Sequence, residues 1–535
     1  RFMEATNRTQ TIQQQAGITA PAPQWISGGI YGRAGITGTP EYPSRTFENV
    51  QPYHFGPRIG VAYQLDPKTV ARIGYGLNWM TLTGNTFMNG AIWNVGYGGL
   101  ARLTQGGSPD GGLTFPLTFS VPMPGGQGYV PPTRGVDELN KKIMGQWFIS
   151  GAENLSPGYE HVFQVNLQRE IGSGENAWVF ELAYSGNLGR DLPFWHGSGE
   201  HILPDAYHKI GPYGSTLFAK VDNPFYGRIP SGGNSGKVLD FGRMYTRNPL
   251  WNEIWTFGDP LGTSNYHSGY FQAEHRFGRG FTFLANYTFG KSLQDVGALQ
   301  GQQMQGQGGQ AFPQAGLGLG DIYGLATNDI RHKLLFNYSW DLPFGSGKAL
   351  LTDAGGVLNQ IVGGWRVAGT TTFRSGTPAY AFIGGGGVGA PGALWYNIGH
   401  GRMSRPVFVS PRIDYDGGVD GHTALEGSAG YQPYMIRESM RMPQIYPNLL
   451  EIGDIPSAFS DLRYPGFSQW DFSLLKNFPF AGEGRYLQFR AEAENLFNRM
   501  NPGNPGGNIL ARDFGMITSQ RGNPRRIMLA LKLYF

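Results

Sequence analysis

Three carboxylates stand close together in the segment DYDGGVDG, at Asp414, Asp416 and Asp420. Hard oxygen ligands at alternating positions around a turn suit Ca²⁺, and the intervening glycines allow the backbone to wrap tightly. A helix-loop-helix calcium site would need a Glu at its twelfth position, but Leu425 and Glu426 follow out of register. The residues therefore predict either a Ca²⁺ ion that stiffens a loop or a plain acidic turn.

A second group of candidate metal ligands lies in the segment WHGSGEHILPDAYH. It comprises His196, Glu200, His201, Asp205 and His208. Imidazole and carboxylate groups can share a divalent metal, but this spacing fits no fixed motif, so solvated loop residues are the simpler interpretation. The segment FGSGKALL around Lys348 lacks the first Gly and the final Ser/Thr of a phosphate-binding loop, and it predicts a tight turn.

The composition limits the remaining function classes. The 535 residues include 84 Gly, 36 Pro and no Cys, and only 15% are charged, whereas soluble chains carry roughly 25%. The net charge of +4, without any long Lys/Arg run, argues against a nucleic-acid partner. Neither a GxSxG nor an HExxH motif is present, and thiolate chemistry is excluded. We therefore expect no enzymatic activity and no required cofactor.

The elements that position these residues are predicted to be strands, because apolar and polar residues alternate along eleven segments. The last segment, RRIMLALKLYF, places an almost aliphatic row on one face, which we expect to contact lipid: Ile527, Leu529, Leu531, Leu533 and Phe535. The others lie at 57–65, 69–79, 159–171, 176–186, 265–277, 281–291, 328–342, 365–374, 467–478 and 485–498. Most run about ten to fourteen residues, which is longer than soluble strands and sufficient for a tilted strand to cross a bilayer.

The connections between these segments alternate in length. One set is short, except for 343–361, and lies at 66–68, 172–175, 278–280 and 479–484. The other set is long and lies at 1–56, 80–158, 187–264, 292–327, 375–466 and 499–524. Barrels of the outer membrane have short periplasmic turns and long external loops. The predicted fold is therefore all-β: a transmembrane antiparallel β-barrel.

The strand count predicts that this sheet belongs to a larger barrel. Bacterial single-chain barrels have an even number of strands, and eleven strands that begin after an external loop cannot complete one. The polar rows of these strands are expected to line a wet lumen. Their charged members are Arg58, Arg72, Arg331, Lys333, Arg366, Arg374, Arg490, Glu492 and Glu494. Such charges can hold another domain by ion pairs, or they can be polar simply because water fills the lumen.

Several stretches in this order resemble one known family. They include PRIGVAYQLDPKTVARIGYG, WVFELAYSGNLGRDLP, NDIRHKLLFNYSWDLPFGSGK, GGWRVAGTTTFRSGTP and QFRAEAENLFNRMNP. The set resembles the barrel of TonB-dependent outer-membrane receptors of the Oar-like group, over roughly residues 50–535. The resemblance implies a 22-stranded barrel in the bacterial outer membrane, an N-terminal plug, and contact with the TonB complex through an N-terminal segment.

This resemblance sets the expected organisation and function. Residues 1–56 are expected to form an external loop and 57–535 the C-terminal half of the barrel, with the plug and the other strands absent from this chain. The partners would be outer-membrane lipid, the plug, the missing strands and a solute such as a metal chelate, glycan or peptide. A passive porin, or an adhesin or scaffold that displays the long loops, remains an alternative.

Overall fold

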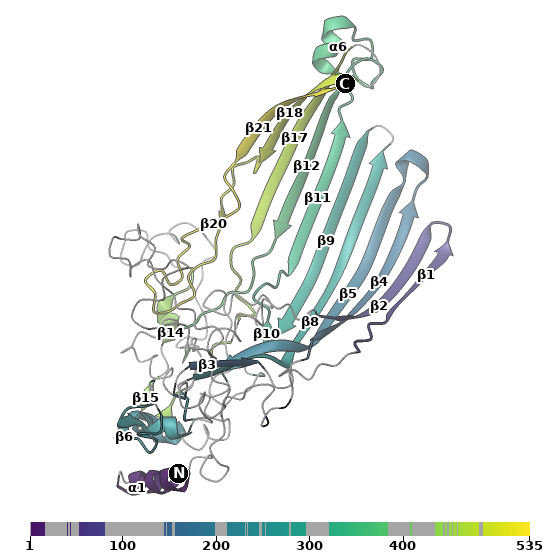
Figure 1. The fold of residues 1–535 in the computed structure, drawn as a ribbon. Coiled ribbons are helices and arrows are strands. Elements are labelled where there is room, and N and C mark those ends of the chain that lie inside the picture. Colours follow the sequence, from purple (N-terminus) through teal and green to yellow (C-terminus); the bar gives the residue numbers. More distant parts are fainter. Residues whose placement is uncertain are drawn as a thin grey trace, which may run out of the picture.

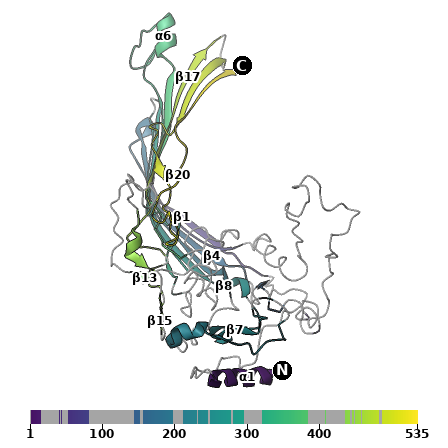
Figure 2. The same ribbon diagram turned by 90° about the vertical axis from the view of Figure 1, so that its left-hand side faces the viewer.

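One large antiparallel sheet dominates the fold, and eleven of its 13 strands follow one another in chain order (Figure 1). The computed structural model describes residues 2–15, 40, 43, 53–80, 144–145, 147–151, 156–197, 211–229, 232, 234–245, 249–251, 253–277, 280–295, 320, 322–383, 407–408, 434–441, 444–446, 449–451, 453–456, 458–480 and 485–535. Figure 2 shows that the sheet is curved and that the segments outside it gather mainly at one of its ends.

The bounds of the eleven strands confirm the alternating segments predicted from the sequence. They are β1 (Arg58–Asp66), β2 (Thr69–Trp79), β4 (Tyr159–Ile171), β5 (Trp178–Gly197), β8 (Glu253–Phe277), β9 (Phe281–Gln294), β11 (His332–Asp341), β12 (Trp365–Arg374), β17 (Phe467–Pro479), β18 (Tyr486–Glu494) and β21 (Arg526–Tyr534). Strands β5 and β8 contain 20 and 25 residues and extend well beyond the predicted segments. Beside the main path, β3 (Trp147–Gly151) pairs in parallel with β8, and β10 (Gly324–Leu325) pairs with β9.

The sheet has a turn end and a loop end. Short connections join the strands at the turn end, and the connection between β11 and β12 contains helix α6 (Gly356–Val362). The chain's C-terminus lies at this end, whereas the N-terminus and the described elements of the long connections, such as β6, β14 and β15, lie at the loop end (Figure 1). Positive φ angles at Gly345 (111°) and Gly347 (72°) confirm the tight turn predicted around Lys348.

Small elements occupy the loop end. They are α1 (Phe2–Gln15), η4 (Gly211–Phe218), β6 (Lys220–Asp222), β7 (Val238–Asp240), η5 (Phe241–Tyr245), β13 (Val407–Phe408), η7 (Arg437–Ser439), β14 (Met440–Arg441), β15 (Ile445–Tyr446), β16 (Leu449–Leu450), β19 (Asn501–Pro502) and β20 (Gln520–Arg521), while η3 (Gly174–Asn176) lies at the turn end. Helix α1 was not predicted from the sequence; its 14 residues include neither Gly nor Pro. In the described part of the chain, no helix has the length and apolar character needed to cross a membrane.

Two long connections pack together at the loop end in a compact cluster, which we call the loop core. It comprises Ala379, Ala381, Ile383, Tyr434, Met435, Met440, Ile455, Phe459, Leu462, Tyr464, Ile509, Phe514 and Ile517. Main-chain hydrogen bonds join its segments, for example from Ala379 N to Leu462 O (2.9 Å) and from Tyr434 N to Gly515 O (2.8 Å). The connections predicted only as external loops therefore contain an apolar core of their own.

Candidate functional site

The strand register divides the side chains of the sheet between two faces. Directly opposed residues share a face, so the pairing of Ile527 with Ala493, and of Ala493 with Phe472, propagates one apolar row across three strands. The side chains of Ile527, Leu529, Leu531, Leu533 and Phe535 are 57% to 95% exposed. No second layer of the described chain covers this row, as a surface in contact with lipid requires.

The opposite face carries the charged residues that the sequence analysis grouped together. Following the register from β1 to β21 places eight of them on this side, which we call the polar face: Arg58, Arg72, Lys333, Arg366, Arg374, Arg490, Glu492 and Glu494. Arg331 stands just before β11, and its carbonyl accepts a hydrogen bond from Gly290 N (3.0 Å). The side opposite is called the apolar face below.

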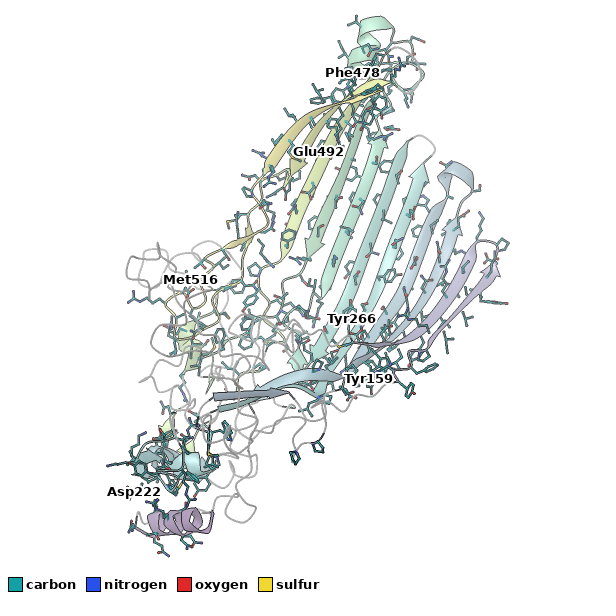
Figure 3. The ribbon with its side chains drawn as sticks, viewed as in Figure 1. Tyr159, Asp222, Tyr266, Phe478, Glu492 and Met516 are labelled. Atoms are coloured by element: carbon teal, nitrogen blue, oxygen red, sulfur yellow. The ribbon has the colours of Figure 1, made fainter. Side chains whose placement is uncertain are left out.

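A cleft of about 490 Å³ opens on the polar face where β11, β12, β17, β18 and β21 adjoin. Its polar lining includes Asn337, Thr370, Asp471, Ser473, Glu492, Glu494 and Arg526. Figure 3 shows Glu492 on the β18 segment of the sheet. The cleft therefore combines three carboxylates with a guanidinium group, and it can hold cationic or hydrogen-bonding groups against its acidic side.

Hydrogen bonds hold the carboxylates of this cleft in place. Asp471 Oδ1 accepts from Asn495 N and from Gln469 Nε2, both at 2.9 Å. Arg490 donates to Glu492, and the two form an ion pair on the same strand. The Nε atom of Arg490 is buried and has no hydrogen-bond partner in the described chain. The acidic groups are thus pre-positioned, while one buried guanidinium N–H of Arg490 has no acceptor among the described residues.

A second polar network covers β2, β4, β5 and β8. Arg72 Nη1 donates to Gln168 Oε1 at 2.7 Å, and Asn166 and Tyr270 both donate to Glu181 Oε1. Near the turn end, the guanidinium of Arg366 forms an ion pair with Asp341 on the neighbouring strand. The polar face therefore contains fixed arrays of both charge signs along its whole width.

At the loop end of the polar face two cations stand directly opposite each other. Lys333 on β11 pairs in register with Arg374 on β12, and in the described chain neither forms an ion pair. The guanidinium of Arg374 lies over the ring of Phe467, 4.9 Å from its centroid. Directly opposed like charges destabilise a sheet, so this cationic mouth is an arrangement that an anionic ligand would stabilise.

A buried ion pair connects the loop core to the sheet. Arg463 Nη2 lies 2.5 Å from Asp329 Oδ2, and the Asp329 side chain is only 1% exposed. Arg463 also donates to the carbonyls of Asp329 and Gly376, each at 3.1 Å. The loop core is therefore attached to the segment just before β11 by a largely buried, charge-assisted contact.

The structure does not describe the predicted metal ligands fully. Asp414, Asp416 and Asp420 lie outside the described residues, so the calcium interpretation stays a prediction. His196 belongs to β5, although its side chain is not described, and Glu200, His201, Asp205 and His208 also lie outside the described residues. Among the described residues, no group of three or more His, Cys, Asp or Glu side chains is arranged to hold a metal ion.

Sequence reasoning missed two features of the apolar face. Residue Lys476 is 2% exposed, and its ammonium lies 4.9 Å from the ring centroid of Trp365. Three tyrosine hydroxyls contact histidine rings on neighbouring strands, at Tyr75–His161, Tyr184–His267 and Tyr287–His332. The alternation places these residues on one face, but the sequence offers no signal that would pair them across 86, 83 and 45 positions.

The fold and its two-faced sheet define a class of protein: a transmembrane β-sheet protein of the barrel type. The sequence matches a family model described as an outer membrane beta barrel domain over residues 2–528. The chain therefore belongs to this family, and its place is the bacterial outer membrane. The turn end then corresponds to the periplasmic side and the loop end to the external side.

Solved structures provide distant similarities to transporters. One is the outer membrane transporter YddB from Escherichia coli, with 9% identity and a TM-score of 0.43, covering 90% of this chain and 40% of that chain. Another is the pyoverdine receptor FpvA from Pseudomonas aeruginosa PAO1, with 10% identity and a TM-score of 0.34, covering 90% and 36%. The copper transporter OprC shows 8% identity and a TM-score of 0.33, covering 89% and 39%. No curated protein sequence matches the chain significantly.

These similarities are too low to carry an argument about activity. The chain spans 40% or less of the length of each of these three structures. What their names say about transport is therefore a property of those proteins.

Proposed function

We propose that this chain is the C-terminal half of the barrel of a TonB-dependent outer-membrane receptor of the Oar-like group, which moves a large solute across the outer membrane. The observation that carries the proposal is a single path of eleven long strands with an apolar face and a mixed-charge polar face. Within the described sheet, β1 and β21 each have one neighbour, which supports a barrel completed by further strands.

The charge distribution of the polar face supports a filled lumen. The cleft near Glu492 and the cationic mouth near Lys333 have opposite sign, so a plug domain with both kinds of charge can form ion pairs with each. Charged pairs at a partly hydrated interface are weak individually and can be exchanged when a ligand arrives. A plug held in this way would be released in steps when the TonB complex pulls on it.

The external mouth favours an anionic solute. Lys333 and Arg374 stand at the loop end of the polar face, where a solute arriving from outside would first meet the barrel. A positive rim around a recess raises the local concentration of anions and speeds their capture. Within the range of metal chelates, glycans and peptides, this arrangement favours those that carry negative charge.

A surface scaffold is a second candidate function. The loop core packs two long external connections together, and Arg463 attaches it to β11. A pre-formed external domain of this kind can present a stable surface to another protein as readily as it can contact a solute. A passive porin is less compatible, because porins usually have about 16–18 strands around an open channel.

Planar-bilayer conductance of the protein in its full natural length separates these functions. A receptor with a plug is expected to conduct poorly until a denaturant unfolds the plug, and its uptake in cells should stop when the proton motive force is dissipated. An open channel without denaturant would support a porin. Absence of any solute uptake that depends on the proton motive force, together with recovery of a protein partner through the loop core, would support the scaffold.

A further inference from the structure

The apolar face repeats one tyrosine–histidine contact three times near the external end. The hydroxyl of Tyr184 lies 2.6 Å from His267 Nδ1, and the corresponding distances are 2.9 Å for Tyr75–His161 and 2.8 Å for Tyr287–His332. In each case the tyrosine lies on one strand and the histidine on the next strand of the path. A contact repeated across β2–β4, β5–β8 and β9–β11 indicates a band that follows the sheet.

The register shows that the three contacts lie at a single depth in the membrane. Directly opposed residues can be followed from strand to strand. From Tyr75 on β2 they lead through β4 to Gly186 on β5, which lies two residues closer to the external end than Tyr184. Following the pairing from Tyr184 leads on β9 to Phe289, again two residues beyond Tyr287. The shift is two residues for two strands, or about one per strand, which is the stagger that tilted barrel strands produce. The contacts therefore form a band perpendicular to the barrel axis.

Permanent cations stand on the strands between the histidines. Lys291 on β9 is directly opposite His267, and Arg190 on β5 is directly opposite Tyr159, whose ring lies 5.4 Å from that of His161. Figure 3 shows Tyr159 at the loop end of the sheet. Five successive strands thus contribute a basic side chain to this band, which we call the basic rim: His161, Arg190, His267, Lys291 and His332.

Nearby carboxylates do not neutralise this rim in the described part of the chain. Glu160 lies on the polar face, where it accepts a hydrogen bond from Asn187 (3.1 Å). Asp295 is 9% exposed and accepts from Thr263 N, and Asp329 is paired with Arg463. Arg190 donates to the carbonyl of Ser264 and to the Asn265 side chain, which leaves its charge uncompensated.

The periplasmic end of the sheet is arranged differently. Arg169, on the apolar face of β4, lies 3.8 Å from Asp66, and Lys68, in the turn between β1 and β2, lies 3.7 Å from Glu170. Each of these two cations thus lies near a carboxylate, whereas in the described chain none of the basic-rim side chains forms an ion pair.

We propose that the basic rim binds the phosphate groups of a glycolipid in the outer leaflet. Aromatic side chains at a membrane interface set the depth of the barrel, which would place the rim at the level of the lipid headgroups. Guanidinium, ammonium and imidazole N–H groups make short, charge-assisted hydrogen bonds to phosphate oxygens. The Tyr hydroxyl contacts Nδ1 of each His, so Nε2 is the ring nitrogen that remains available to a phosphate oxygen. This role is independent of any transported solute.

Lipid binding by the protein in its full natural length tests this proposal. Phosphatidylcholine vesicles that contain bis-phosphorylated lipid A, or the same lipid after enzymatic removal of its phosphates, serve as probes. The double variant R190Q/K291Q is expected to bind the phosphorylated lipid roughly tenfold more weakly or worse, and the dephosphorylated lipid unchanged. Lys291→Gln alone, which leaves the hydrogen bonds of Arg190 to Ser264 and Asn265 in place, is expected to show a smaller loss in the same direction.

The matched control is K68Q/R169Q, which removes two positive charges from the periplasmic end and should leave binding unchanged. A reduced affinity of the control equal to that of R190Q/K291Q would overturn the assignment, because net charge alone would then explain the effect. Equal binding of phosphorylated and dephosphorylated lipid would also overturn it. Competition by an equal amount of inorganic phosphate would show a site for free phosphate, against the lipid proposed here.

Discussion

Lys476 lies in an apolar row of β17 and donates a hydrogen bond from its ammonium to the carbonyl oxygen of Ile361 at 3.2 Å, at the C-terminal end of helix α6. The same ammonium also donates to the carbonyl of Gly363. Carbonyls at the end of a helix have no partner inside the helix and attract a cation. A charged residue is thereby accommodated on the surface that faces lipid, and the long periplasmic turn is held against the strand.

Replacing Lys476 with Met should release this turn. The substitution keeps the apolar stem but removes bonds from a charged donor, each of which contributes about 1.5–3 kcal/mol. Amide hydrogen exchange in α6 is expected to accelerate roughly tenfold or more, while the melting temperature of the barrel changes little. Lys348→Met, in the same turn and exposed, is the control. Unchanged protection in α6 would show that Lys476 does not hold the helix.

Neutralising the external mouth should affect ligand capture more than stability. Arg374→Gln removes the repulsion from Lys333, so the free energy of unfolding should stay the same or rise by roughly 0.5 kcal/mol. Binding of a fluorescent disulfonate dye, used as an anionic probe, should weaken. Arg58→Gln is the control, because Arg58 lies on the same face but donates to Asn78 (3.0 Å). A dye affinity that falls equally in both variants would argue against a localised mouth.

A methyl group at Gly376 should prevent the loop core from docking. A Cβ atom there would lie 1.6 Å from the carbonyl oxygen of Tyr464, which is too close for any side-chain adjustment to relieve. Gly376→Ala is expected to destabilise this region by roughly 1–3 kcal/mol or more and to expose the amide of Ala379 to exchange. Gly74→Ala, where no atom lies within 4 Å, should behave like the unmodified protein.

Acid should loosen the external segment that contains β15 and β16. The hydrogen bond and charge of Arg441 hold the pKa of Glu451 below its ordinary value of 4.5. A carboxylate with a lowered folded-state pKa contributes stability above its unfolded-state pKa, and this contribution is lost as pH falls through the folded-state value. The protection factor of the amides at Ile445–Tyr446, which is exchange measured relative to the intrinsic rate at each pH, should therefore fall on acidification below the ordinary pKa.

Glu451→Gln provides the comparison for this pH effect. The variant keeps a hydrogen-bond acceptor for Arg441 but cannot titrate, so its segment should be equally loose at neutral and acidic pH. An acid-induced loosening that persists unchanged in the variant would assign the pH dependence to another group.

The strands were predictable because their two faces contact different surroundings, so that apolar and polar residues alternate with a period of two. The row from Ile527 to Phe535 alternates without interruption, and β21 follows it closely. Lys476 breaks such a row, and the carbonyls that compensate it come from α6, more than a hundred positions earlier in the chain. Local periodicity cannot show a contact of that kind, so the role of Lys476 emerged only from the structure.

The candidate site was predictable only as a set of faces. Alternation placed Lys333, Arg374 and Glu492 on the polar side, but the like-charge opposition and the cleft depend on how β11, β12 and β18 are aligned. Register in turn depends on hydrogen bonding between segments that are far apart in the chain. The loop core escaped prediction for a related reason: Gly- and Pro-rich connections carry no periodic pattern, although their few apolar residues converge in space.

The unusual length of β5 and β8 gives the molecule a stiff projection. At about 3.3 Å per residue, the 25 residues of β8 have a contour length of roughly 80 Å, while the hydrocarbon of a bilayer is about 30 Å thick. The ladder between the two strands continues, with register shifts, as far as Gly197 and Trp255. This two-stranded ribbon is a direct continuation of the barrel wall. A force applied to the outer end of the ribbon would therefore act directly on the strands of the barrel wall, because no loop separates the two.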